Sequence, residues 1–320
     1  MDNKIIHLMA CPFTGLGLYN GFRGNRWLKN RIKVFEQFVI PSLLNQTNKD
    51  FIVWLAWRRE EKFNPIVKDF QKRLEEIKGL RFIHTFSGIF FYDDKYEDKI
   101  AKDRLIMSLH GIIGELIDVI GEVDEIYETI QPSDDLYAND TVERIQKVFR
   151  DMPEVQACGF SRGYIMDYRT QELAEYNPNT NPPFFTIRFK KDDFINPLKH
   201  IEYLSIKKEI GKYKVGTPYP SHEYIGDVLR YYVMPSRQFL VGIHGENIST
   251  VFNHPFRGKI VTNEKEEILE KFGIKNVSKL IIQVSWRKKL LSKLPHKWQK
   301  ILRYVFGEKI FNKLYNWLRA

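Results

Sequence analysis

Short apolar runs that alternate with helical patterns constrain the fold of this chain more than any other feature. The predicted strands are residues 4–9, 51–57, 80–86 and 125–130. The residues that recur at helical spacing between them are Leu28, Ile32, Phe35, Phe38 and Val39, and then Ile106, Leu109, Ile112, Ile113, Leu116, Ile117 and Ile120. Strands that alternate with helices predict an α/β fold, with a mostly parallel central sheet flanked by helices.

The composition sets broad limits on the class of protein. A chain of 320 residues that is 43% hydrophobic can form one large α/β domain with appendages, or two domains. It has no run of 18 apolar residues that predicts a membrane span, and its N-terminus lacks a signal-peptide layout. The two cysteines, Cys11 and Cys158, do not predict a disulfide framework or a cysteine metal site. We therefore expect a cytoplasmic protein of a bacterium.

Two adjacent carboxylates follow the fourth predicted strand. Asp134 and Asp135 come just after Ser133 and before a helix whose predicted capping box is Asp140 with Glu143. The pair is therefore not needed as a helix cap, although it could consist of solvated turn residues. Carboxylate oxygens at the end of a strand suit Mg²⁺ or Mn²⁺, which bridge phosphate oxygens.

A resemblance to a known family rests on motifs in three parts of the chain. Residues 41–47 (PSLLNQT) followed by 49–51 (KDF) resemble the first helix and second strand of inverting GT-A glycosyltransferases. Residues 129–135 and the HGEN segment at 244–247 resemble later motifs of the rhamnosyltransferase-like family. The resemblance covers roughly residues 4–260. It implies a Rossmann-related GT-A-like fold, a nucleotide-sugar donor and metal-assisted, inverting transfer of a sugar.

The chain departs from the family pattern at one acidic position. Pro132 stands where the first acid of the motif is expected, and Ile130 stands where an arginine is expected. The resemblance then implies that Asp134 makes the main contact to Mn²⁺ or Mg²⁺, with Asp135 nearby. His244 is a candidate late ligand of the metal or contact of the phosphate, or a structural histidine.

Transfer of a sugar to an acceptor hydroxyl needs a general base. Glu223 is the first candidate, and Asp227 and the pair Asp192 and Asp193 are its rivals. Glu223 could equally be a solvated acid in the first turn of a helix.

The nucleotide is expected near the carboxyl ends of the first strands. Candidate contacts there are Pro12, Phe13, Thr14, Trp57, Arg58 and Ser133. Trp57 could instead belong to the core, and Arg58 to the surface. The glycine-rich loop at 14–25 has neither a GxGxxG nor a Walker pattern, so a dinucleotide site or a P-loop is not expected.

The C-terminal segment holds nearly all of the net charge of +10. Residues 285–320 contain ten Lys or Arg and one acid, together with three of the six tryptophans, at amphipathic helical spacing. Such a helix suits an anionic membrane surface, although it could also pack on the catalytic domain. We expect a GT-A-like domain at 1–262, with a nucleotide-sugar half at 1–150 and an acceptor half at 151–262. A basic helical tail at 263–320 follows.

These observations predict a glycosyltransferase of bacterial surface polysaccharide assembly. It would act on a glycan or lipid-linked acceptor, at the inner face of the cytoplasmic membrane. A metal-dependent nucleotidyltransferase could use the same acids. A nucleic-acid-binding protein could use the cationic tail, but no nucleic-acid-binding motif appears and no such partner is expected.

Overall fold

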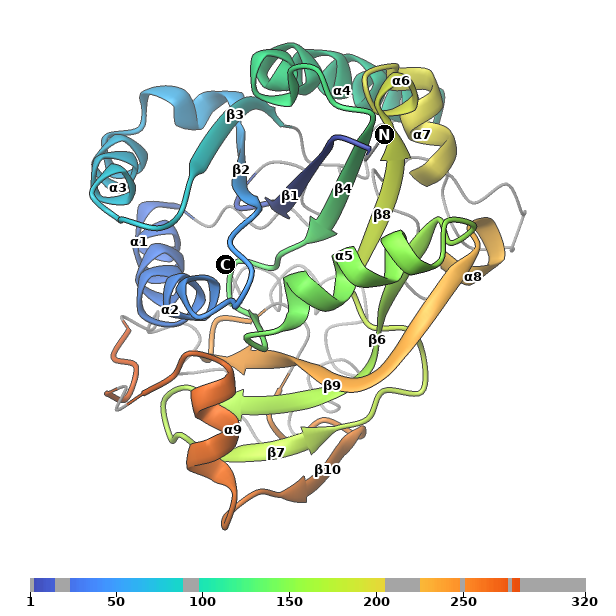
Figure 1. Ribbon diagram of the computed structural model, residues 1–320. Coiled ribbons are helices and arrows are strands. Elements are labelled where there is room, and N and C mark those ends of the chain that lie inside the picture. Colours follow the sequence, from blue (N-terminus) through green and yellow to red (C-terminus); the bar gives the residue numbers. More distant parts are fainter. Residues whose placement is uncertain are drawn as a thin grey trace, which may run out of the picture.

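The computed structural model describes residues 3–14, 24–88, 98–204, 225–247, 251–275 and 278–282 of the chain. The described residues form a mixed α/β structure in which one curled sheet of ten strands is flanked by helices (Figure 1). The four predicted strands and the two predicted long helices are all present. The expected fold class, α/β with helices on the faces of a central sheet, is confirmed.

The first half of the sheet is parallel. Its strands are, in spatial order, β3 (Phe82–Gly88), β2 (Ile52–Arg58), β1 (Ile5–Cys11) and β4 (Glu125–Ile130). Met9 at the centre of β1 pairs with Val53 on one side and Thr129 on the other. The side chains of β2 and β4 are buried on both faces, as expected for parallel strands covered by helices.

The second half of the sheet adds antiparallel pairs. The strands are β5 (Leu136–Tyr137), β6 (Ala157–Asp167), β7 (Leu173–Tyr176), β8 (Phe185–Lys190), β9 (Tyr231–Ile243) and β10 (Arg257–Ile260). β8 is antiparallel to β4, β6 is antiparallel to β8, and β9 is parallel to β6. Because the chain direction reverses from β4 to β8 and again from β8 to β6, β6 and β9 run in the same direction as β4. The carboxyl ends of β1, β4, β6 and β9 therefore point to the same edge of the sheet.

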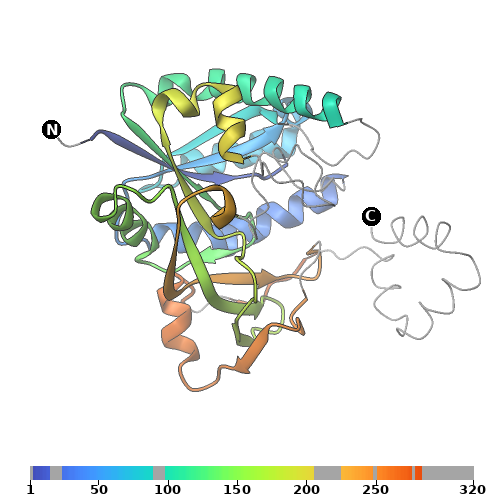
Figure 2. The same ribbon diagram turned by 90° about the vertical axis from the view of Figure 1, so that its right-hand side faces the viewer.

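Two hydrophobic layers hold the helices against the sheet. One layer joins the sheet to α1 (Gly24–Val34), the π-helix η1 (Phe35–Val39), α2 (Ile40–Leu44), α3 (Pro65–Glu75), α5 (Thr141–Asp151) and α9 (Lys265–Lys271). The other joins it to α4 (Asp98–Ile120), α6 (Lys191–Phe194) and α8 (Ile225–Val228), and α7 (Pro197–Leu204) contacts α4 and α6. Figure 2 shows α4 and α1 on opposite sides of the sheet.

Local signals account for the helix starts only in part. Asn64 caps α3 because its side-chain oxygen accepts a hydrogen bond from the N–H of Ile66, and Pro65 occupies the first helical position. The predicted capping box of α5 is not formed. The Asp140 carboxylate binds Arg144 at 2.6 Å instead, and Glu143 accepts a hydrogen bond from the Thr47 hydroxyl. An arginine one turn further along thus takes the place of the backbone N–H groups as the partner of this half-buried acid.

Most of the expected basic tail at 263–320 lies outside the described residues. Only its beginning, with α9, is described, and the amphipathic segment 285–320 stays a prediction. Among the described helices, none combines the length and the apolar character that crossing a membrane requires.

A buried histidine in β1 should make stability depend on pH. His7 is fully buried; its Nε2 lies 2.7 Å from the Thr129 hydroxyl, and Gln146 donates to its Nδ1 at 3.3 Å. Burial lowers the pKa of His7 to about 3, because the charged form loses its hydration. Neutral His7 therefore stabilises the fold fully above the unfolded pKa of about 6.5, and this contribution is lost as the pH falls towards 3.

We expect the difference in unfolding free energy between the wild type and His7→Gln to shrink as the pH is lowered below about 6. A plot of this difference against pH should approach a slope of about 1.4 kcal/mol per pH unit, the value for one titrating group. Urea unfolding at pH 7, 6 and 5 measures it, and the contributions of other histidines cancel in the comparison. A difference that stays constant with pH would contradict the assignment.

Candidate functional site

The candidate site lies where the order of the parallel strands reverses. β1 has β2 and β3 on one side and β4 on the other, so a crevice is expected between the carboxyl ends of β1 and β4. The chain leaves β4 at Ile130 and enters a short loop that carries both predicted acids. Gln131, fully buried, holds this loop by donating to the carbonyl of Asp135 at 2.9 Å, and the Tyr137 hydroxyl donates to the carbonyl of Ile130.

The Asp134 carboxylate is the centre of the site. Its Oδ2 atom lies 2.5 Å from Arg31 Nη1, 3.1 Å from His244 Nε2 and 3.3 Å from Asn247 Nδ2. The Arg31 charge and the His244 hydrogen bond outweigh burial and hold the pKa of Asp134 well below its usual range. Burial lowers the pKa of His244, so a neutral imidazole with its hydrogen on Nε2 fits the contact to Asp134. The N–H of Glu246 faces the other ring nitrogen at 3.4 Å.

The neighbouring carboxylate has a different role. Asp135 is 9% exposed, and its Oδ1 atom accepts a hydrogen bond from the backbone N–H of Gly242 at 2.8 Å. Burial and the negative charge of Asp134 raise the pKa of Asp135 well above its usual range. Asp135 therefore joins the loop after β4 to β9, whereas Asp134 carries the charge of the pair.

Helix α1 contributes two arginines to this cluster. Arg31 pairs with Asp134, and Arg26 lies 2.5 Å from Glu246 Oε1, which belongs to the segment after β9. Glu246 is 1% exposed and Arg31 is 6% exposed. Within the described part of the chain, Glu246 Oε2 and the Nε and Nη1 atoms of Arg31 have no hydrogen-bond partner. Arg31 Nη1 therefore meets Asp134 as an ion pair, and both Glu246 and Arg31 keep unused hydrogen-bonding capacity in a buried position.

The predicted metal ligands lie close together, but both acids among them already have other partners. The Asp134 oxygen that faces the cluster already contacts three donors, and Asp135 is tied to the backbone of β9. Among the described residues, no three or more His, Cys, Asp or Glu are grouped so that they could hold a metal ion. Ligation by Asp134, Asp135 and His244 stays a prediction.

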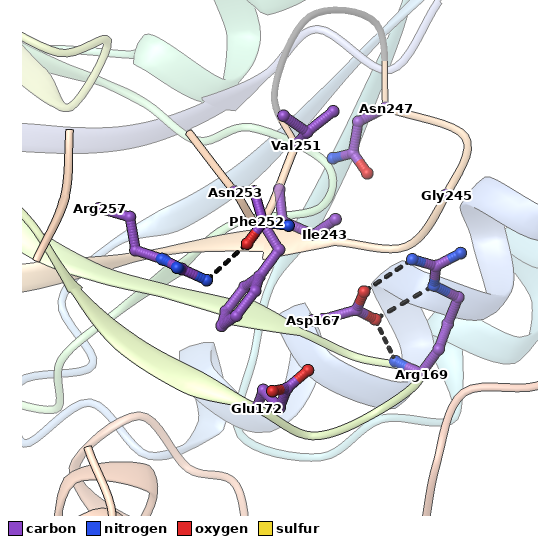
Figure 3. A pocket seen from close by; sticks show the side chains of 10 residues that line it. All are labelled: Asp167, Arg169, Glu172, Ile243, Gly245, Asn247, Val251, Phe252, Asn253 and Arg257. Atoms are coloured by element: carbon purple, nitrogen blue, oxygen red, sulfur yellow. Dashed lines mark hydrogen bonds and ion pairs between the residues drawn. The ribbon is translucent and has the colours of Figure 1, made fainter. Parts of the chain in front are cut away.

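A pocket of about 580 Å³ adjoins the cluster at the carboxyl ends of β6 and β9 (Figure 3). It is lined by Asp167, Arg169, Glu172, Ile243, Gly245, Asn247, Val251, Phe252, Asn253 and Arg257. Asn247 connects the two regions, because it lines the pocket and contacts Asp134. Figure 3 shows Phe252, Asn253 and Arg257 on one side and Arg169 with Gly245 on the other.

The charged groups of this pocket differ in how they are used. Both carboxylate oxygens of Asp167 already accept hydrogen bonds, because Arg169 binds both of them and two backbone N–H groups point at Oδ1. Glu172 is exposed and accepts one hydrogen bond, from the Thr170 hydroxyl at 3.1 Å. The Arg257 guanidinium lies 5.1 Å from the ring of Phe252 and binds Asn253. Glu172 and Arg257 are therefore the charges best placed to meet a ligand.

A second pocket, of about 530 Å³, lies at the carboxyl end of β3. It is lined by Arg59, Lys62, Phe86, Ser87, Gly88, Met107, Ser108 and Glu115. Glu115 is fixed there by the N–H of Phe86 and the hydroxyl of Ser87, each at 2.5 Å. The two pockets thus flank the Asp134 cluster along the same edge of the sheet.

Several predicted nucleotide contacts lie in the protein interior instead. Phe13 is 3% exposed and stacks on Trp57, which is fully buried, with ring centroids 4.6 Å apart. The buried Thr14 hydroxyl accepts the N–H of Arg58, whose guanidinium binds Glu61. Neither aromatic ring is open to a ligand, because both belong to the core under α1 and α3. Pro12 and Ser133 are half-buried at the ends of β1 and β4.

Those predicted general bases that the structure describes are not brought to this cluster. Glu223 lies outside the described residues. Asp227 is exposed on α8, which precedes β9, whereas the site lies beyond the carboxyl end of that strand (Figure 1). Asp192 and Asp193 follow β8, which runs in the opposite direction to β4, so they also lie at the other edge of the sheet.

Sequence reasoning missed most of the partners of Asp134. Asn247 belongs to the HGEN segment but had no assigned role, and Arg31 lies in the predicted first helix, between the apolar positions Leu28 and Ile32. Both residues belong to the site only through contacts between segments more than 100 residues apart, such as that of Asn247 with Asp134. A polar residue within a predicted amphipathic helix carries no signal that it points inward.

The comparisons with known proteins concern the same region. Residues 22–82, which include Arg26 and Arg31, match the family described as "Putative rhamnosyl transferase". This match confirms the resemblance to rhamnosyltransferases over these residues and supports a glycosyltransferase.

The similar solved structures include a "putative nucleotide-diphospho-sugar transferase" from Desulfovibrio desulfuricans G20. It is 13% identical, with 75% of this chain and 80% of that chain covered and a TM-score of 0.33. No curated protein matches the chain.

The close approach of β9 to the Asp134 loop should make Gly242 intolerant of a side chain. A Cβ atom at Gly242 would lie 2.2 Å from the carbonyl oxygen of Asp134 and 2.4 Å from the ring of Tyr168. We expect Gly242→Ala to reduce the unfolding free energy by about 1–3 kcal/mol, because neither neighbour is flexible. Gly114→Ala on α4, with open space around its Cβ, is the control and should not destabilise the protein. Equal effects in urea unfolding would contradict the close approach.

Proposed function

We propose that this protein is a glycosyltransferase that moves a sugar from a nucleotide-sugar donor to an acceptor hydroxyl. The observation that carries the proposal is the cluster around Asp134 at the reversal of strand order. It combines cationic, acidic and neutral polar groups from α1, the loop after β4 and the end of β9. The family match over residues 22–82 supports the same class of activity.

The donor is proposed to extend from the pocket at β3 to the Asp134 cluster. That pocket offers the apolar side chains of Phe86 and Met107 and the hydroxyls of Ser87 and Ser108, a combination that suits a nucleoside. Arg59 and Lys62 add positive charge to its lining. β3 and β1 are two strand spacings apart, about 10 Å. A nucleoside in the pocket can therefore place its diphosphate beside the arginines of α1.

The acceptor is proposed to bind in the pocket of Figure 3. The Phe252 ring can cover an apolar sugar face, while Asn253 and Arg257 can bind hydroxyls or an acidic substituent. Asn247 lies between this pocket and the Asp134 cluster, so a hydroxyl held there can approach the donor sugar. The proposed donor pocket is then formed by the expected donor half at 1–150, and the proposed acceptor pocket by the expected acceptor half at 151–262.

Glu172 is proposed to act as the general base. Its carboxylate takes the proton of the acceptor hydroxyl as that oxygen bonds to the anomeric carbon of the donor. The bond between the anomeric carbon and the diphosphate oxygen breaks, and the diphosphate leaves with the electron pair. Attack from the face opposite the leaving group inverts the anomeric configuration.

A role in bacterial surface polysaccharide assembly is proposed for the reaction. It is supported by the resemblance to rhamnosyltransferases and by the basic, tryptophan-rich segment at 285–320, which suits attachment to an anionic membrane surface. The alternative of a nucleotidyltransferase is not favoured by any contact in the described residues.

A panel of nucleotide sugars linked to UDP, GDP and dTDP tests the donor class. We expect one nucleotide class to raise the melting temperature, because a ligand that binds only the native state stabilises it by mass action. Release of the nucleoside diphosphate from that donor, with a mixture of methyl glycosides as acceptors, then reports transfer. No thermal shift with any donor on folded protein would contradict the proposed function.

Glu172→Gln tests the proposed base. We expect the transfer rate to fall by about 10²–10⁴-fold, with the donor-induced thermal shift retained, because the variant loses proton transfer but not donor binding. Glu154→Gln is the matched control, since Glu154 is an exposed acid before the amino end of β6, away from the pocket. Equal transfer rates for the wild type and Glu172→Gln would remove Glu172 from the reaction.

A further inference from the structure

We infer that Arg31, assisted by Arg26, supplies the positive charge that the donor diphosphate requires, so that this protein binds its donor without a divalent metal ion. The inference rests on the proposed function and identifies the group that binds the leaving diphosphate. It concerns residues that had no predicted role, since the acid pair alone suggested a metal.

The first step is that one oxygen of Asp134 is already occupied. A carboxylate oxygen has two lone pairs, whereas Asp134 Oδ2 already faces donors from Arg31, His244 and Asn247. A cation bound at that oxygen would have to displace at least the guanidinium, whose Nη1 atom lies 2.5 Å away. The loop provides no third acid, because Pro132 stands two residues before Asp134.

The second step is the charge balance of the cluster. Arg26 and Arg31 together carry two positive charges, opposite the carboxylates of Glu246 and Asp134. A divalent cation between two carboxylates would have the same balance. The two arginines therefore occupy the place that a divalent cation would take between these acids.

The third step is the hydrogen-bonding capacity of Arg31. Its guanidinium is 6% exposed, and its Nε hydrogen has no acceptor among the described residues. A planar guanidinium binds phosphate oxygens with two parallel hydrogen bonds, which a Lys ammonium cannot reproduce. Asp134, with a side chain 15% exposed, holds Arg31 beside the loop that follows β4. Arg31 can then stabilise the charge that develops on the leaving diphosphate.

The test measures metal binding and nucleotide binding separately on the whole chain after treatment with EDTA. Electron paramagnetic resonance of Mn²⁺ reports whether the protein alone binds the ion. Titration calorimetry with UDP, GDP and dTDP, in EDTA and then in Mn²⁺, reports nucleotide affinity. We expect the spectrum of free Mn²⁺ to be unchanged by the protein, and one nucleotide to bind equally well in EDTA and in Mn²⁺.

Variants of Arg31 identify the cation. Arg31→Met should weaken binding of that nucleotide by about 10- to 100-fold, because a charge-assisted hydrogen bond is lost. Arg31→Lys keeps the charge and guards against misfolding of the Met variant, and should still bind more weakly than the wild type. Arg144→Met, which removes an exposed ion-paired arginine on α5, should leave nucleotide affinity unchanged.

Two results would overturn the inference. Stoichiometric Mn²⁺ binding that Asp134→Ala abolishes, or nucleotide binding only when Mn²⁺ is present, would assign the charge to a metal and leave the glycosyltransferase proposal intact. Wild-type affinity in a folded Arg31→Lys variant would show that the guanidinium does not bind the diphosphate. Absence of binding of every nucleotide, with and without Mn²⁺, would reject the inference and the proposed function together.

Discussion

The contact between Asp134 and Arg31 is the interaction on which the arrangement of the site depends. It joins α1 to the loop after β4, and His244 and Asn247 bring the segment after β9 to the same carboxylate. Both charged side chains are largely buried, so each needs the other, because an unpaired charge in this position would be strongly unfavourable. The geometry of the cluster is therefore a consequence of charge compensation between three separate segments.

The direction of the strands explains how these segments meet. β6 and β9 regain the direction of β1 and β4 after the antiparallel strand β8. The loops after β4, β6 and β9 consequently gather at one edge, which the two pockets and the Asp134 cluster share. Acids that follow β8 or precede β9 are placed at the opposite edge by the same topology, whatever their chemical suitability. Strand direction thus separates candidates that look equivalent along the chain.

The two adjacent acids show how tertiary contacts divide roles between identical side chains. The guanidinium beside Asp134 lowers the pKa of that carboxyl, whereas burial and the neighbouring charge raise the pKa of Asp135. Asp135 is used to bind the backbone of β9, and Asp134 is left to organise polar side chains. Two adjacent aspartates in a sequence suggest one shared function. In the structure, Asp135 binds the backbone of β9, whereas Asp134 pairs with charged and polar side chains.

Local apolar periodicity predicted the four parallel strands, the core helices and the α/β class, because each of these elements is recorded in a short stretch of chain. The sequence also located Asp134 and His244, since acids and a histidine at strand ends are visible as short motifs. Three outcomes required the three-dimensional arrangement: Arg31 and Asn247 join Asp134, Phe13 and Trp57 are core residues, and Glu172 lines a pocket. These outcomes depend on strand order and on long-range packing, and a local pattern does not specify which distant segment a side chain will meet.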